Sequence, residues 1–123
     1  MSYGNAWGNS LLNQLRLYPD GAERTLYLAL HTSDPGPADS TTTELSGGSY
    51  ARKIVSFAPP ASKMMVTNTP VVWSGLRTST ISYVALWDSL TAGHIVAYGS
   101  ITPVSITNGG SFTLGIGEFT VTI

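Results

Sequence analysis

The first regular pattern along the chain is helical. The segment Leu11–Leu15 places three leucines on one helix face, and a capping asparagine or serine stands directly before it. The turn sequence Pro19-Asp20-Gly21 follows and does not continue a helix. The pattern therefore predicts a short amphipathic helix over residues 9–18. The polar, glycine-rich residues 1–8 are expected to form an N-terminal arm.

The rest of the chain has the patterns of strands. Runs rich in β-branched and aromatic residues alternate with turn-forming Gly, Pro, Asn and Asp at spacings of about ten residues. The runs are 25–32, 49–57, 64–67, 71–73, 81–87, 95–101, 104–106, 111–114 and 119–123. The runs before and after Asp88–His94 are expected to pair as a hairpin. The fold class predicted is all-β: an antiparallel β-sandwich or small jelly-roll-like barrel of about seven to nine short strands over residues 25–123, with one short N-terminal helix.

Two segments carry further expectations. Residues 34–48 form a polar loop that is long for a compact domain, which is typical of functional or mobile segments. The longest uncharged apolar stretch, Ile95–Ile106, is interrupted by Gly99 and Pro103 and is too short to span a membrane, so we expect it to be a core segment. With 123 residues the chain has room for a single domain, residues 1–123.

Composition and charge narrow the function classes. Charged residues make up 11% of the chain and the net charge is −1, so the basic patch of a nucleic-acid or anionic-membrane binder is missing. The absence of cysteine excludes disulfides, thiolate nucleophiles and cysteine-containing zinc sites. The N-terminus lacks the basic start and apolar run of a secretory signal, so synthesis in a cytoplasm is expected.

Residues for chemistry are few. His31 and His94 lie in different elements without a metal-binding spacing, and we expect each to be structural or exposed to solvent. The acids stand in or beside turns, where turn chemistry accounts for most of them. A carboxylate pair such as a glycosidase uses depends on distances in space, so a hydrolase sandwich stays as an alternative. No catalytic, metal or cofactor residue is predicted, and no cofactor.

Aromatic residues are the other candidates. Trp73 and Trp87 lie in strand-like runs and are expected in the core. Tyr3 and Trp7 sit in a leader that cannot bury them unaided, which favours an arm that docks on a neighbouring protein. Together with Tyr50 and Arg52 they form the predicted assembly interface.

Several segments carry a resemblance to a known family. They are the N-terminal leucine-rich helix, Leu28–Pro35 (LALHTSDP), Glu44–Arg52 (ELSGGSYAR), Val84–Asp88 (VALWD) and Ala97–Gly99 (AYG). From about Leu11 to Ile123 the chain resembles small structural proteins of tailed-phage virions, whose members are labelled tail fibre, head fibre or minor capsid and decoration proteins. The resemblance implies a structural role in the virion and supplies no catalytic residues.

These observations together predict a non-enzymatic virion protein. We expect first a capsid decoration or cement protein on the outer surface of the icosahedral shell. It would bind the major capsid protein or other virion proteins and assemble as a homotrimer, with mobile polar loops facing outward. The chain has no heptad or collagen-like repeat from which to build a shaft. The alternative is a tail or tail-fibre component in tail assembly or host adsorption, with a glycan as a partner. A small carbohydrate-binding module is the second alternative.

Overall fold

The computed structural model describes residues 3–122 and divides the chain into two compact units. The helical unit comprises Met1–Thr25, Val55–Pro70 and Leu114–Ile123, and the sheet unit comprises Leu26–Ile54 and Val71–Thr113. Each unit therefore combines segments that are far apart in the sequence. The prediction of a single domain over residues 1–123 stays a prediction.

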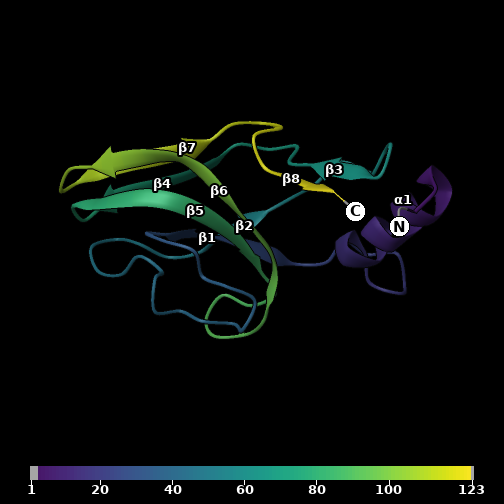
Figure 1. Cartoon of the computed structure of the whole chain (residues 1–123), viewed down its shortest axis with the longest axis horizontal. Coiled ribbons are helices and arrows are strands. Elements are labelled where there is room, and N and C mark those ends of the chain that lie inside the picture. The colour runs from purple at the N-terminus through teal and green to yellow at the C-terminus, as the bar shows by residue number, and fades with distance from the viewer. Residues whose placement is uncertain (1–2, 123) are drawn as a thin grey trace. The chain divides into compact units, whose positions relative to one another are not determined.

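One helix and eight strands make up the described chain (Figure 1). They are α1 (Asn5–Arg16), β1 (Leu26–His31), β2 (Lys53–Val55), β3 (Met64–Val66), β4 (Val71–Leu76), β5 (Ser79–Trp87), β6 (Ile95–Ile106), β7 (Gly110–Leu114) and β8 (Thr120–Thr122).

The sheet unit is built around a four-stranded sheet with the order β2-β1-β5-β6. Strand β5 pairs antiparallel with β1, with Leu30 opposite Val84, and antiparallel with β6 on its other side. Nearly all of β1 is buried on both faces, which explains its uninterrupted apolar sequence. A second sheet joins β4 and β7, and its Trp73 ring contacts Phe112 with 5.9 Å between centroids.

The all-β, antiparallel fold with one short helix is confirmed, as are the buried positions of Trp73 and Trp87 and the β5–β6 hairpin. None of the sheets closes into a barrel within residues 3–122, so the architecture is that of an open sandwich.

In the helical unit α1 contacts β3, and β3 pairs antiparallel with β8. The backbone N–H of Lys63, just before β3, donates to the side-chain oxygen of Asn9 on α1 at 2.8 Å. Phe57 and Phe119 contact each other with their rings 6.3 Å apart. This unit therefore depends on all three of its chain segments.

The helix begins at Asn5, not at residue 9, so the predicted boundaries of helix and arm were wrong. The first helical turn closes when the N–H of Gly8 donates to the carbonyl of Gly4 at 2.9 Å. Gly8 precedes Leu12 by four residues, and both are the buried residues of α1. The glycines that suggested a flexible arm thus belong to the start of the helix and to its packed face.

Two strand boundaries also differ from the prediction. The run 49–57 yields only the three residues of β2. The runs 95–101 and 104–106 join in one strand, β6, which contains Pro103. A proline is tolerated there because β6 is the last strand of its sheet, where an N–H on the open side has no ladder partner to lose.

The expectation that Ile95–Ile106 is a core segment was wrong. Most of β6 is exposed or half-buried, and Ile106 alone is buried among its residues. A neighbouring strand covers one edge of β6 only. The two serines, one threonine and one glycine of β6 suit solvent as well as a sheet.

A glycine in the loop before β2 gives a first testable prediction. Gly48 has φ +57, and a β-carbon there would lie 2.5 Å from the carbonyl oxygen of Gly75. Gly48→Ala therefore adds a backbone clash to left-handed strain and should lower the free energy of unfolding by about 2 kcal/mol or more. Gly109→Ala is the control, because Gly109 also has positive φ but open space around it. Urea unfolding measures both variants; equal losses would contradict the clash.

Candidate functional site

The structure separates the four residues predicted for an assembly interface into two pairs. Tyr50 and Arg52 lie together in the sheet unit, whereas Tyr3 and Trp7 belong to the helical unit. The two pairs also differ in exposure, because Arg52 is buried and Trp7 is exposed.

Arg52 is the centre of an internal polar cluster. Its guanidinium forms a bidentate ion pair with Glu44: Nε donates to Oε2 at 3.0 Å and Nη2 to Oε1 at 2.9 Å. Tyr50 donates from its hydroxyl to Oε2 of Glu44 at 2.6 Å and accepts the backbone N–H of Leu30 at 3.2 Å. Burial and the neighbouring carboxylate raise the pKa of Tyr50 above its ordinary value, so the phenol stays protonated. We call Glu44, Tyr50 and Arg52 the Glu44 cluster.

The remaining donors of Arg52 hold a second loop. Nη1 donates to the carbonyl oxygens of Ser89 and Ala92, at 2.9 and 2.8 Å, and the guanidinium lies 4.0 Å from the centre of the Trp87 ring. One side chain therefore links the loop 34–48, the β5–β6 loop and the core tryptophan. Because the Arg52 side chain is 3% exposed, its charge acts within the subunit.

His31 packs beside this cluster. Its ring stacks on Trp87, 6.3 Å between centroids, and its Nδ1 shares a hydrogen bond of 2.9 Å with the hydroxyl of Thr43. Burial lowers the pKa of His31, so its ring is neutral at neutral pH. Each histidine was expected to be structural or exposed to solvent, and the buried His31 is of the structural kind.

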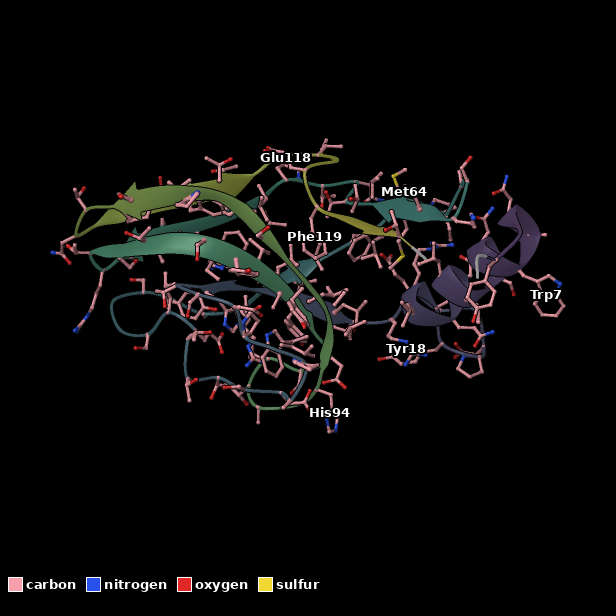
Figure 2. The ribbon with its side chains drawn as sticks, viewed as in Figure 1. Trp7, Tyr18, Met64, His94, Glu118 and Phe119 are labelled. Carbon is pink, nitrogen blue, oxygen red and sulfur yellow. The ribbon has the colours of Figure 1, made fainter. Side chains whose placement is uncertain are left out.

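His94 and Asp39 fasten the far part of the long loop. Asp39, with φ +59, accepts a hydrogen bond from His94 Nδ1 and another from the N–H of Ile95, both at 2.8 Å. The carboxylate of Asp88 accepts the N–H of His94, also at 2.8 Å. Figure 2 shows the imidazole of His94 at the periphery, pointing outward. The loop 34–48, which was expected to be functional or mobile, thus has two attachments. The contacts of Asp39 hold it to the start of β6, and the Glu44 cluster holds it to the β5–β6 loop.

The exposed aromatics of the helical unit form a different kind of site. Trp7 is 74% exposed and Tyr3 47%, and Figure 2 shows the indole projecting away from α1. A tryptophan with this exposure leaves a large apolar area in water. Trp7 stands on a rigid helix rather than in an arm, which orients it for contact with another molecule.

A groove near the end of α1 contains another exposed aromatic ring, Tyr18. Arg24 lies over this ring, 4.7 Å from its centre, and donates to the carbonyl oxygens of Gln14 and Leu17 at 3.1 and 3.3 Å. The guanidinium therefore satisfies carbonyls that the helix leaves unpaired at its C-terminal end. The groove is lined by Ser10, Asn13, Gln14, Leu17, Tyr18, Pro19 and Arg24.

Residues 3–122 contain neither a cluster of metal-ligating side chains nor a helix that could span a membrane. In that part of the chain no three His, Asp or Glu side chains come together as they would to hold a metal ion. Nor does α1, the helix of the described chain, have the length and apolarity needed to cross a membrane.

The comparisons with known proteins identify a family. A family model described as podophage GP4 fiber I protein gp80 matches residues 2–122. The chain belongs to this family. A search of curated proteins found no match. The resemblance to phage virion structural proteins is confirmed, and the gp80 family is one labelled as fibre. The chain is therefore a structural component of a phage virion.

Sequence reasoning missed the partners that organise the loops. Glu44 and Asp39 are lone acids in a segment of Ser, Thr, Gly and Pro, and nothing adjacent in sequence shows their contacts with Arg52 and His94. Tyr50 and Arg52 are two residues apart in a strand-like run and so were expected to face the same way, but the turn at residues 47–49 separates them from Glu44.

The Glu44 cluster predicts a large effect of one isosteric change. Glu44→Gln leaves the buried Arg52 without its counter-charge and should lower the free energy of unfolding by about 3 kcal/mol. Glu118→Gln is the control: this exposed carboxylate contacts the backbone of Gly115, and its change should cost about 0.5 kcal/mol or less. Chemical unfolding followed by circular dichroism compares the two. Equal effects would show that the ion pair does not hold the fold.

The two histidines should titrate in opposite directions from 6.5. The hydrogen bond that His94 donates to Asp39 raises the pKa of His94, and burial lowers that of His31. The native state thus binds extra protons at His94: its stabilisation is complete below pH 6.5 and is lost as the pH rises through the raised pKa. At His31 the unfolded state binds more protons, so stability falls as the pH drops below 6.5.

NMR titration of the imidazole signals measures both values. Asp39→Asn should return the pKa of His94 towards 6.5 and leave that of His31 unchanged. A His94 pKa at or below 6.5 in the unaltered chain would contradict the pairing with Asp39.

Proposed function

We propose that this chain is a non-enzymatic subunit of a phage fibre, held in the particle by contacts of its helical unit centred on Trp7. The observation that carries the proposal is the match of residues 2–122 to a family described as a fibre protein. The exposed indole supports a role in assembly, because tryptophan is enriched among the residues that dominate protein interfaces.

The internal contacts support a structural rather than a catalytic role. Glu44 pairs with Arg52, and Tyr50 is held protonated between Glu44 and Leu30. Each of these groups is thus engaged by another group of the subunit, an arrangement that stabilises a fold.

A capsid decoration protein is the second candidate. The low content of charged residues and the lack of a heptad or collagen-like repeat favour it, since such a chain packs on a shell without building a shaft of its own. In a fibre, by contrast, the chain would supply a globular module, with the shaft contributed by other proteins.

Immunogold labelling of intact particles separates the candidates. Gold confined to projecting fibres supports the proposal, gold spread over the heads supports decoration, and unlabelled particles would overturn both. The antibody must recognise the folded subunit in solution, which a binding assay on the purified protein establishes beforehand.

A variant of Trp7 tests the assembly contact. Trp7→Ala keeps a good helix former in α1 and should weaken incorporation, with an affinity loss of roughly thirtyfold if the indole is a central interface residue. Ile116→Ala, at a site 66% exposed in the same unit, is the matched control and should incorporate normally. Both variants should keep the circular dichroism spectrum of the unaltered protein. Normal incorporation of Trp7→Ala would refute the role of Trp7. Deleting residues 1–8 is a poorer test, because it removes the first turn of α1.

A further inference from the structure

The groove at the end of α1 is formed by the helix and by the chain that follows it. A turn after Leu17 brings this chain back alongside the helix. The N–H of Tyr18 donates to the carbonyl of Ala22 at 2.8 Å, and the N–H of Arg24 donates to that of Arg16 at 2.7 Å. The groove has a volume of about 510 Å³, within the range of small-molecule sites. Because backbone contacts fix its walls in advance, a ligand does not have to order them.

One wall of the groove is a polar face of α1. Ser10, Asn13 and Gln14 have the spacing i, i+3, i+4 and share a side of the helix, opposite to the buried Gly8 and Leu12. Ser10 and Gln14 are exposed, so their hydroxyl and amide groups are accessible. Hydroxyl and primary amide groups can both donate and accept hydrogen bonds. This wall therefore matches a ligand that carries several hydroxyl groups.

The other wall contains the aromatic ring of Tyr18, which is 41% exposed. The guanidinium of Arg24 lies 4.7 Å from the centre of this ring and restricts the positions that the ring can take. A ring held in this way offers a flat apolar surface to the C–H groups of a ligand. A sugar ring has an apolar C–H face and a rim of hydroxyl groups, so it fits both walls at once.

The charge of the groove favours an uncharged ligand. Within the described chain no carboxylate lines the groove, so a metal ion or a basic peptide finds no counter-charge there. The one cation, Arg24, is engaged: its Nη2 donates to the carbonyl oxygens of Gln14 and Leu17, where the helix dipole places negative partial charge. A single guanidinium used in this way is too little to hold a polyanion.

We propose that this groove binds a neutral sugar unit of a glycan, stacked on Tyr18 and hydrogen-bonded by Asn13 and Gln14. The site is distinct from the assembly contact proposed for Trp7. Figure 2 shows Tyr18 and Trp7 at opposite ends of α1, and Trp7 does not line the groove. Sugar binding is therefore a further activity of the helical unit that does not depend on the proposed place in the virion.

Two variants remove one wall each. Gln14→Ala deletes the amide, keeps the backbone carbonyl that Arg24 contacts, and introduces the best helix former. Tyr18→Ala deletes the stacking surface and keeps the backbone N–H that donates to Ala22. Tyr3→Ala is the matched control, because it removes another exposed ring of the same unit, outside the groove. Circular dichroism establishes that each variant is folded.

The probe is an array of immobilised oligosaccharides, both neutral and uronic-acid-containing, incubated with the purified protein. NMR titration with the neutral oligosaccharide that binds best then measures the dissociation constant. The unaltered protein and Tyr3→Ala should bind equally, with shifts of the backbone amides that line the groove. Gln14→Ala should raise the dissociation constant roughly fivefold, and Tyr18→Ala roughly tenfold. Added salt should leave the affinity unchanged, because charge contributes little.

Four results would overturn the proposal. They are an array on which no neutral oligosaccharide binds, amide shifts that lie outside the groove, an affinity that neither Gln14→Ala nor Tyr18→Ala weakens, and a preference for acidic oligosaccharides that salt abolishes. The measurement uses purified protein without phage particles. Its failure therefore leaves the fibre role and the contact through Trp7 untouched, just as unlabelled particles would leave sugar binding untouched.

Discussion

The bidentate contact between Glu44 and Arg52 is the constraint on which the loops of the sheet unit depend. A buried guanidinium is tolerated only when its donors are satisfied, and here a carboxylate and two carbonyls satisfy them. The Trp87 ring beneath it adds a cation–π contact and anchors the group to β5. Long polar segments thereby acquire a fixed conformation without disulfides or metals.

The chain builds its surface largely from neutral side chains. Hydroxyl groups keep the strands soluble. The few charged side chains act in specific places: in the Glu44 cluster, in the contacts of Arg24 with the end of α1, and in the hydrogen bond between Asp39 and His94. A surface of this kind suits a protein that lies among many copies and other virion proteins, because it carries little long-range repulsion.

The sequence predicts features that depend on residues close together in the chain, and it does not predict contacts between residues that are far apart in it. Strands such as β1 and β5 were predictable because their apolar residues are contiguous, and the hairpin because its turn is local. The start of α1 was missed because glycine is a poor helix former, and only the structure shows that Gly8 lies on the buried face of the helix. The exposure of β6 was missed because sequence alone does not say which strand ends the sheet. The contacts of Glu44 and Asp39 join residues distant in sequence, so composition gave no sign of them.

The construction of the helical unit has a consequence during synthesis. Its helix α1 is made first, yet the strand that the helix contacts, β3, pairs with Thr120–Thr122, which leave the ribosome long after the helix. Contact order of this kind delays folding until the distant segment arrives. A chain broken off before β8 leaves β3 without its partner strand, so we expect α1 to be less stable in it. Such a fragment would lack the ordered helix that the proposed contact through Trp7 requires.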